Sequence, residues 1–574
     1  MVVPSNGNSK RMRIVLLISF LFSVFGFTNA QLYLNSDHDL YHLLDRMELK
    51  LNDFNRLNFH SSNKPYSYED VTSLKSQSIQ ASTIDSLNFE YFKNQAFFFN
   101  PENGTRKQPF LKYFYAQNAS LFSVAAEHFK VSVNPVLYFS GSGETGSNAA
   151  TSYHETLYIN TRGAELQGVV DDKISFYALA TDNQMRVPLQ TKAFGAQKYA
   201  LPGESFFKYF KGNGVDFFHA EGYVSAPITK HISMQFGSAR QFIGDGIRSL
   251  ILSDFSKQHL FLKLNTKVWK INYQNLFYEL VDSAYNTGAG NYAKKFAATH
   301  HLSINITKSF NLGFFETVIF KRDHNAYELN YLNPIIFYRA VEHSLGSPDN
   351  VLLGLNYKWN LKRSVQFYGQ IVFDEFLLAH MRAQFLKSKS NPEWGWWGNK
   401  YSIQCGLKAI DLFRINNLDA QLEYNHIRPY TYSYTNLSLS FTDFNQSMTH
   451  PLGANLKEVV ASLFYQPTSK IHIQFKTFTA LTGIDTSEAI SYGADLLKAN
   501  HIRRGEFGNF TGQGLKTIIA YYEVAMSYRL GQQLYLDAGF TFRKKHTSLT
   551  AFNNQNQYFS FGLRLNAAQR NFMY

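Results

Sequence analysis

From about residue 109 onward, apolar and polar positions alternate with a period of two residues. This is the period that places successive side chains on opposite faces of a strand. One face of the alternating segments is apolar, and the other carries Arg, Glu, Gln, His, Ser and Gly. The pattern therefore predicts a long series of strands with one face in an apolar environment. The clearest segments are 365–373, 471–475, 524–530, 534–542 and 559–565.

An apolar strand face either packs on a second sheet or, in a barrel, faces lipid. Lipid is favoured by aromatic pairs near strand ends, such as Tyr521 with Tyr522, and by the sole cysteine, Cys405, which excludes an intrachain disulfide. At 9–11 residues per spanning strand, the strand-rich part would hold about 16 to 18 antiparallel strands. We predict an all-β transmembrane barrel, and a secreted β-sandwich or propeller is the alternative.

Residues 31 to about 105 follow a helical pattern instead. Ser36 with Asp39 fits a capping box that would open the first helix. Short amphipathic helices bury little on their own, so they must pack on something larger. We expect a small periplasmic helical segment that packs on the barrel mouth through its apolar side chains, which are Leu40, Leu43, Leu44 and Met47.

The first thirty residues predict export. Three basic residues precede an apolar stretch at 14–27, and Ala30 ends it before Gln31. This is typical of a secretory signal peptide cleaved after Ala30; a membrane anchor is the weaker alternative because the stretch is short for a span. We predict a bacterial outer-membrane location, with a signal peptide at 1–30, the periplasmic helical segment at 31–105 and the barrel at 106–574.

The composition excludes several classes of protein. With 52 Phe, 36 Tyr and 5 Trp, aromatic residues make up 16% of the 574 residues, and charged residues only 17%. A chain this aromatic and this poor in charge is not disordered. It is not a helical membrane protein either, because no run of about 20 apolar residues follows the N-terminal stretch. The net charge of +13 is a mild bias over this length and predicts no nucleic-acid partner.

Signals of catalysis or metal binding are weak. His38, His42 and Asp45 have the spacing of metal ligands on one helix face, but the solvated face of an amphipathic helix has it too. Adjacent Asp374 and Glu375 would point to opposite faces of a strand and cannot pair as acid and base. The sequence has no zinc-protease motif, phosphate-binding glycine loop or nucleophile elbow. We predict no enzyme, no catalytic residues, no metal and no cofactor.

Charged residues occur together where strands and loops would line a barrel interior. Arg240, Asp245 and Arg248 fall within the stretch 237–254. One interpretation is a ladder of ion pairs that fills and stiffens the barrel. The other is recognition of an anionic or sugar-rich polymer by arginine side chains. The sequence leaves both open.

A second group of candidates is aromatic. Trp394, Trp396 and Trp397 lie in a loop-like segment with Pro392 and two glycines. Exposed aromatic rings suit stacking on sugars, and they equally suit a girdle at the membrane interface.

A third group is the pair Arg503 and Arg504, in the Gly- and Asn-rich segment 501–514. The segment has the composition of a long extracellular loop, which makes these arginines candidates for holding an acidic polymer. The alternative is that they pair with Glu506 and with lipid headgroups.

Several short motifs occur along the mature chain in a characteristic order. They are Tyr33-Leu34, Asp37-His38, Tyr41-His42-Leu43-Leu44-Asp45-Arg46, Lys64-Pro65-Tyr66-Ser67, Gly203-Glu204-Ser205, Gln241-Phe242-Ile243-Gly244-Asp245-Gly246, Gly346-Ser347-Pro348-Asp349-Asn350, Asp374-Glu375-Phe376, Arg428-Pro429-Tyr430 and His450-Pro451-Leu452-Gly453-Ala454-Asn455. Together they resemble the Wzi-like capsule-assembly outer-membrane proteins of the Bacteroidetes, a group that includes gliding-motility proteins of the RemB type. The resemblance spans nearly the whole mature chain. It implies an outer-membrane barrel of about 18 strands above a small periplasmic helical bundle. It also implies a non-catalytic role in holding surface polysaccharide to the cell.

Two classes of function follow from the sequence. The first is a non-enzymatic barrel for capsule attachment or gliding motility, with partners among outer-membrane lipid, surface or capsular polysaccharide, and surface-motility or envelope proteins. The second is a porin-like diffusion channel. The occupancy of the lumen distinguishes the two.

Overall fold

The computed structural model describes residues 31–34, 40–72, 74, 82–95, 120–148, 151–282, 292–335, 337–386, 389–570 and 572–574. The predicted signal peptide, the capping pair Ser36 and Asp39, and His38 lie outside the described residues.

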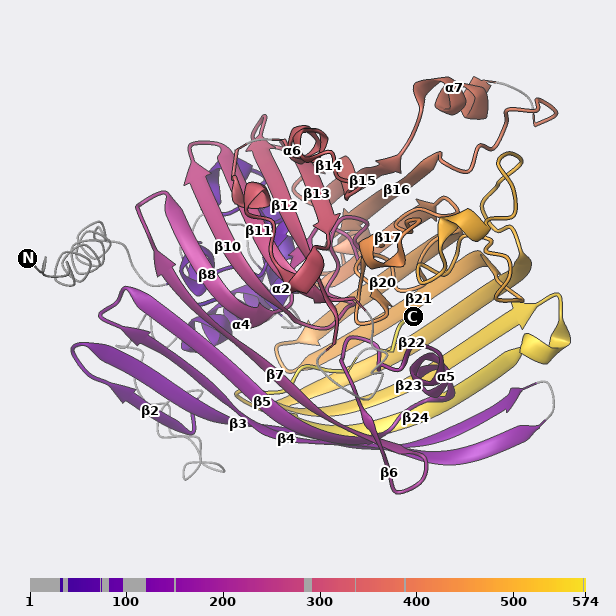
Figure 1. Ribbon diagram of the computed structural model, residues 1–574. Coiled ribbons are helices and arrows are strands. Elements are labelled where there is room, and N and C mark those ends of the chain that lie inside the picture. The colour runs from indigo at the N-terminus through magenta and orange to yellow at the C-terminus, as the bar shows by residue number, and fades with distance from the viewer. Residues whose placement is uncertain are drawn as a thin grey trace, which may run out of the picture.

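Antiparallel strands close into a barrel, seen from the side in Figure 1. The ring holds 18 strands among the described residues, and β24 pairs with β3 to close it. The predicted barrel and the predicted strand number are therefore confirmed. The ring strands are β3 Phe129–Asn148, β4 Ser152–Val170, β5 Ile174–Arg186, β7 Gly214–Pro227, β8 Ile232–Ala239, β10 His259–Val268, β11 Ile271–Val281, β12 Lys294–Asn305, β13 Phe310–Phe320, β14 Asn350–Lys362, β15 Val365–Glu375, β16 Lys400–Ala409, β17 Leu418–Ile427, β20 Leu456–Thr468, β21 Ile471–Ile484, β22 Leu515–Gly531, β23 Leu534–Thr547 and β24 Asn554–Leu565.

Short strands and helices accompany the ring strands. Two short strands, β2 Phe122–Ala125 and β6 Lys208–Phe210, pair with β3 and β7. Two small sheets lie apart from the ring, β1 Asn63–Lys64 with β9 Phe242–Ile243 and β18 Thr442–Asp443 with β19 Gln446–Ser447. The helices are α2 Leu40–Leu51, α3 Tyr68–Thr72, α4 Thr83–Gln95, α5 Leu189–Lys198, α6 Tyr338–Leu345 and α7 Leu378–Leu386, with 3₁₀ turns η1 Phe54–Arg56, η4 Asp323–Asn325, η5 Leu329–Leu332, η6 Leu412–Arg414, η7 Leu437–Leu439, η8 Asn500–Ile502 and η9 Thr550–Phe552.

None of the described helices combines the length and the apolar character that a membrane crossing requires.

The two ends of the barrel differ in their connections. At one end the strands are joined by tight turns, such as 269–270 and 306–309, and we call this the short-turn end. At the other end the connections include the long segments 321–349, 376–399 and 485–514, and we call this the long-loop end.

The alternation seen in the sequence sorts side chains between the outside and the lumen. On β24, Phe559 and Phe561 are 68% and 64% exposed on the outside, whereas Tyr558, the residue before Phe559, is buried. On β23, Asp537 and Thr541 are buried on the lumenal face. The apolar outer face is what a barrel in lipid requires.

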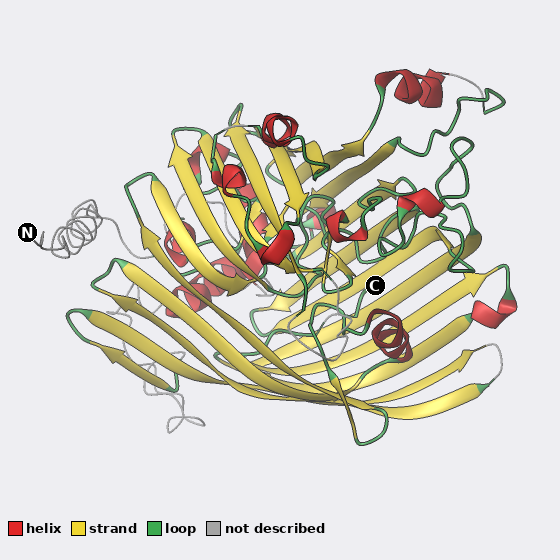
Figure 2. Cartoon of the chain, viewed as in Figure 1, coloured by secondary structure: helices red, strands yellow, loops and turns green. Residues whose placement is uncertain are grey.

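The lumen is not uniformly polar, which corrects the expectation of a polar interior. Inward-facing Phe261, Leu276 and Tyr278 form one buried apolar core with Leu250 and Ile251 from the segment that joins β8 to β10. The segments 240–258 and 428–455 fold back between the walls instead of extending into solvent. Figure 2 shows loop segments within the ring of strands. These segments carry the apolar residues that fill this side of the lumen.

The N-terminal helices occupy the short-turn end. The backbone N–H of Phe54 donates to the carbonyl of Lys308 in the turn between β12 and β13, at 2.7 Å. Asn88 on α4 and Gln466 near the end of β20 exchange hydrogen bonds of 2.7 and 3.0 Å. The helical segment is therefore docked on the barrel, at the end with the tight turns.

The faces of α2 are used differently from the prediction. Leu43, Leu44 and Met47 pack inside the N-terminal segment, against Phe89 and Phe92 of α4, and not on the barrel. The polar face of α2 makes the barrel contacts instead. The reason is that the short segment builds a small apolar core of its own and presents its charges to a wall that is also charged at this end.

Candidate functional site

The segment 240–258 carries all three charged candidates of the first group into the lumen. Arg248 is 5% exposed and its Nη2 lies 3.0 Å from Oε1 of Glu458 on β20. Its Nη1 donates to the carbonyl of Met573 in the C-terminal tail at 2.9 Å. Its backbone N–H donates to Glu423 on β17 at 3.2 Å. Arg248 therefore joins two walls and the tail.

Asp245 lies in a second buried ion-pair group. Its Oδ1 is 3.3 Å from Nζ of Lys358 on β14, and the same ammonium is 3.3 Å from Glu48 of α2. All three side chains are buried. The placement of Asp245 and Arg248 matches the ladder of lumenal ion pairs, and neither presents a free surface to a polymer.

These contacts run from wall to wall. Lys358 on β14 meets Asp245, and Arg248 in the same segment meets β20 and the tail. The tail then reaches β23, where Arg543 donates to the carbonyl of Tyr574 at 3.2 Å. A continuous chain of buried side chains thus crosses the lumen.

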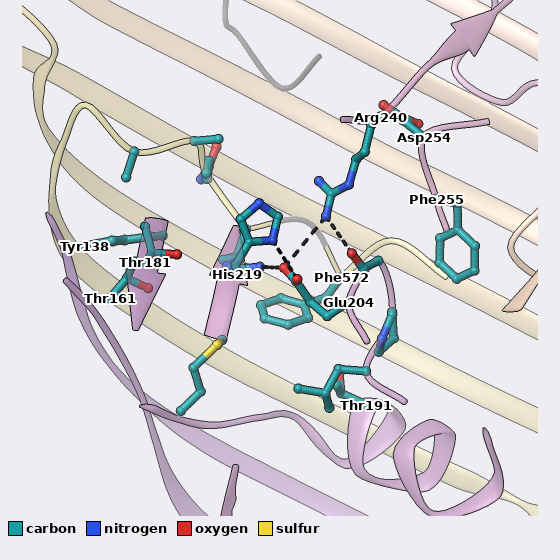
Figure 3. A pocket seen from close by; sticks show the side chains of 18 of the residues that line it. Tyr138, Thr161, Thr181, Thr191, Glu204, His219, Arg240, Asp254, Phe255 and Phe572 are labelled. Carbon is teal, nitrogen blue, oxygen red and sulfur yellow. Dashed lines mark hydrogen bonds and ion pairs between the residues drawn. The ribbon is translucent and has the colours of Figure 1, made fainter. Parts of the chain in front are cut away.

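Arg240 lies apart from this chain, at a lumenal cavity of about 250 Å³ that Figure 3 shows from close by. The cavity lies between the walls formed by β3, β4, β5 and β7, the segment around Glu204, the segment 247–255 and the C-terminal tail. Its volume corresponds to about eight water molecules at liquid density. Tyr138, Phe255 and Phe572 supply aromatic surface to it.

A buried carboxylate organises the charges of this cavity. Oε1 of Glu204 accepts from Arg570 at 2.5 Å, and Oε2 lies 2.7 Å from Nδ1 of His219. Nη2 of Arg240 donates to the carbonyl of Gly203 at 2.6 Å and lies 3.7 Å from Glu204. Burial raises the pKa of Glu204, but His219 and Arg570 outweigh it, so the pKa lies well below its ordinary value. The carboxylate stays charged at neutral pH.

This cavity has the chemistry of a small hydroxyl-binding pocket. It combines charged donors and acceptors with aromatic faces and with Thr161 and Thr181. Across the described residues, no group of three or more His, Cys, Asp or Glu is arranged to hold a metal ion.

Sequence reasoning named Glu204 only as part of a motif and did not name His219, Glu221 or Arg570 as candidates. His219 and Glu221 alternate with apolar neighbours on β7, so the alternation rule could have placed them on the lumenal face. Glu204 and Arg570 are 366 positions apart, and no local pattern connects them.

The second and third groups of candidates meet at the long-loop end. The backbone N–H of Trp397 donates to the carbonyl of Glu506 at 2.9 Å, and that of Gly508 to the carbonyl of Trp394 at 2.8 Å. Gly395 has φ of 71°, and a Cβ there would lie 2.7 Å from the backbone of Asn509. Two loops about 110 residues apart in the chain are therefore interlocked, at a point that only glycine allows. We call this pairing of 393–399 with 503–509 the rim cluster.

Side chains complete the rim cluster. The guanidinium carbon of Arg503 lies 4.4 Å from the ring centre of Trp397, and Arg503 also pairs with Glu506. Trp396 stacks on His380 with ring centres 4.6 Å apart. Arg504 is exposed, and no ion pair of its side chain occurs within the described residues. The structure thus joins the tryptophans to the arginines, which the sequence had treated as separate candidates.

The weak metal candidates lie elsewhere. Nε2 of His42 is 2.7 Å from Asp419 of β17, and Asp45 accepts from Lys408 of β16 at 2.7 Å. Both side chains pair with the barrel wall, so this face of α2 is not the solvated face that its spacing suggested.

The same architecture occurs in solved structures. The fold is similar to that of Wzi. That protein is described as an outer membrane protein involved in group 1 capsule assembly in Escherichia coli and as a carbohydrate-binding β-barrel. The match has a TM-score of 0.53 at 11% identity and covers 94% of this chain and 100% of Wzi. At this identity the likeness to Wzi shows the fold alone.

Porins match less well. OccAB2 of Acinetobacter baumannii gives a TM-score of 0.40 at 8% identity, covering 75% of this chain and 98% of that chain. OprD of Pseudomonas aeruginosa gives 0.37 at 11% identity, covering 76% and 96%. These scores are too low to carry an argument.

No family model and no curated protein sequence matches the chain.

Proposed function

We propose that the protein is a non-enzymatic outer-membrane barrel that binds a surface polysaccharide at its long-loop end. The rim cluster carries this proposal. It presents Trp394, Trp396 and Phe507 beside the exposed Arg504, and its interlocked backbones fix these groups in place. Aromatic faces and arginines together suit an acidic sugar polymer. The description of Wzi as a carbohydrate-binding barrel supports the same reading.

The orientation follows from the connections. Outer-membrane barrels have short periplasmic turns and longer extracellular loops. The rim cluster would then face the outside of the cell, and the N-terminal helices would lie in the periplasm. Binding of capsule and a role in surface motility both need a site on this side.

The filled lumen argues against the porin-like alternative. Segments 240–258 and 428–455 and the C-terminal tail occupy the space between the walls, with Arg248, Asp245 and Lys358 buried in mutual contacts. Opening a path would require breaking buried ion pairs, which costs several kcal/mol. The purified protein should give no stable large conductance in a planar bilayer.

The test uses the protein reconstituted in vesicles and polysaccharide extracted from the producing cells. It measures how much polysaccharide the vesicles retain. Trp394→Ala and Arg504→Gln should each lower retention, and the effect of Arg504→Gln should shrink as salt rises, because exposed charges are screened within about 8 Å at physiological ionic strength. The amount of folded barrel should not change.

Matched controls come from the opposite end of the barrel. Trp269 is 85% exposed in a tight turn, and Arg414 is exposed in η6. Trp269→Ala and Arg414→Gln should leave retention unchanged. Equal retention by all four variants would remove the rim cluster from the site, and large conductance of the wild-type protein would favour the channel. Deleting the gene and scoring capsule retention and colony spreading would separate the capsule role from the motility role.

A further inference from the structure

The connection between β13 and β14 lies against the outer wall of the barrel. We call residues 321–349 the outer strap. Its Tyr331 and Tyr338 are buried together with Phe277 of β11 and Val318 of β13. Phe277 lies between Leu276 and Tyr278, which both belong to the lumenal core, so Phe277 points outward. The outer strap therefore covers the face of the barrel that elsewhere meets lipid, on the side where Figure 1 labels α6.

The outer strap covers a polar row on that face. Asn275, His300 and Glu316 are direct neighbours across β11, β12 and β13. A carboxylate facing hydrocarbon would be costly. Here Glu316 accepts the backbone N–H groups of Tyr338 at 2.8 Å and Arg339 at 2.9 Å, at the start of α6, and the ring of Tyr338 lies 4.0 Å from that of His300. Glu316 is thus capped by the strap and His300 is covered by it, instead of facing lipid.

The exposed side of the outer strap is apolar at its tip. Leu329, Ile335 and Phe337 are 72%, 84% and 75% exposed. The tip lies within the height of the strands, because Tyr273, the third residue of β11 from the short-turn end, donates to the carbonyl of Pro334 at 2.6 Å. Large exposed apolar side chains at this height continue the outer apolar surface formed by strand residues such as Phe314.

Several backbone N–H groups of the tip are hydrogen-bonded within the strap. Asn330 and Ile335 donate their N–H groups to side-chain oxygens of Glu328 and Asn333, at 3.4 and 3.1 Å. Tyr331 donates to the carbonyl of Glu328 at 3.1 Å. An irregular segment persists in hydrocarbon only when its polar groups are satisfied from within the protein. Side-chain caps of this kind meet that requirement.

The helix that follows the tip has the opposite character. The exposed face of α6 carries Arg339, His343 and Ser344, and Arg339 pairs with Glu342 at 2.6 Å. α6 leads back toward the long-loop end, where Asp349 accepts from Arg322 at 2.7 Å. The apolar tip and the charged helix α6 together have the pattern of an element that lies at a membrane interface.

We propose that the outer strap is a lipid-binding element that inserts its tip, Leu329, Ile335 and Phe337, among the acyl chains that surround the barrel wall. Acyl chains are the occupant because the exposed side chains of the tip are apolar and lie at the height of the lipid-facing strand residues. This proposal depends on the barrel fold and not on polysaccharide binding.

Spin labels test it directly. In a Cys405→Ser background, Ile335→Cys and Phe337→Cys would be labelled in the purified full-length protein, reconstituted in phosphatidylethanolamine and phosphatidylglycerol vesicles. We expect oxygen, which dissolves in lipid, to relax both labels more than a water-soluble nickel complex does. Phe561→Cys on β24 is the lipid control, and Ala326→Cys, exposed before the tip, is the water control.

Each other outcome overturns the proposal. Stronger relaxation by nickel at 335 and 337, as at 326, would show that the tip lies in water. Weak relaxation by both reagents would show that protein covers it, from a second copy or a neighbouring loop. Leu329→Cys provides a third position should either variant fail to fold. Glu316→Gln weakens the cap on α6 and should increase the relaxation of the label at 337 by the nickel complex. Glu488→Gln, at a 94% exposed carboxylate, should leave that relaxation unchanged.

Discussion

The guanidinium of Arg248 and the carboxylate of Glu458 meet 3.0 Å apart with both side chains buried, and this contact fixes a folded-in loop to the wall of the barrel. Glu458 also lies 2.7 Å from His450 and accepts from Asn425 at 3.1 Å. The carboxylate is therefore shared by two inward-folded segments and by β17. A lumen held in this way is a structural core.

Removing Arg248 should loosen that core. Arg248→Met leaves Glu458 buried without its strongest partner, and breaking a buried ion pair from one side costs about 3–5 kcal/mol. The guanidinium chloride concentration at half-unfolding, followed by tryptophan fluorescence in vesicles, should fall accordingly. Brief conductance events should also appear in bilayers, because the segment 240–258 loses an attachment.

The control for that experiment is Arg414→Gln, at an exposed position of the short-turn end. It should lower the half-unfolding concentration by at most about a third as much as Arg248→Met does, since surface arginines contribute at most about 1 kcal/mol. If the Arg248→Met protein were as stable as this control and gave no conductance events, the packing of the lumen would not depend on the ion pair.

The N-terminal helices should be released by a single substitution. The side chain of Arg46 on α2 donates to Asp85 of α4 at 3.0 Å and also pairs with Asp419 of β17. One buried side chain therefore connects both helices to the barrel. In Arg46→Met, added protease should cut the segment 40–95 in solubilised protein while the barrel stays heat-resistant on a gel. Arg56→Met, at an exposed residue of η1, should be cut no faster than the wild type. Unchanged cleavage in Arg46→Met would mean that apolar contacts alone hold the segment.

The lipid-facing surface can be tested on β24. Phe561→Arg places a charge on the outer face and should cost about 2–4 kcal/mol if the side chain lies near the bilayer midplane. Phe552→Arg makes the same change in η9, outside the ring strands, and should cost far less. Thr541→Arg, which the alternation alone would suggest as a harmless lumenal change, is unsuitable because Thr541 is 5% exposed in a packed interior. Similar losses for Phe561→Arg and Phe552→Arg would contradict a lipid contact at 561.

The strands could be predicted because their signal is local. A period of two in residues such as Phe559, Phe561 and Leu563 reflects the geometry of one strand and the medium on one face. The same reasoning gave the strand number and the helical start of the chain. It also placed Arg503 and Trp397 in loops at the long-loop end.

The lumen could not be predicted, because its contacts connect distant segments. Whether 240–258 extends into solvent or folds inward depends on partners such as Glu458 and Lys358, more than 100 positions away. The packing of Trp397 on Arg503 depends in the same way on a loop that the local pattern does not see. The polar face of α2 was assigned to solvent because the helix pattern alone does not record a charged wall opposite it.

The last prediction concerns acid. The pKa of Glu204 is depressed in the folded protein, where His219, Arg570 and Arg240 surround the carboxylate, relative to an ordinary value of about 4.5. The unfolded chain therefore takes up the proton first as the pH falls. The stability that the carboxylate of Glu204 contributes should be fully present at neutral pH and should decline as the pH falls below about 4.5. The free energy of unfolding, measured from neutral pH downward, should show this decline in the wild type.

Glu204→Gln isolates the contribution of the carboxylate. The variant leaves Arg570 and His219 facing a neutral amide, so it should be less stable than the wild type by about 3–5 kcal/mol at neutral pH. Below pH 4.5 the two proteins should converge, because acid removes from the wild type the charge that the substitution already lacks. Glu488→Gln, at a carboxylate that is 94% exposed, should have a free energy of unfolding that follows that of the wild type at every pH. A difference between wild type and Glu204→Gln that stays constant across this range would show that packing at the cavity, and not the charge of Glu204, holds the C-terminal tail in the lumen.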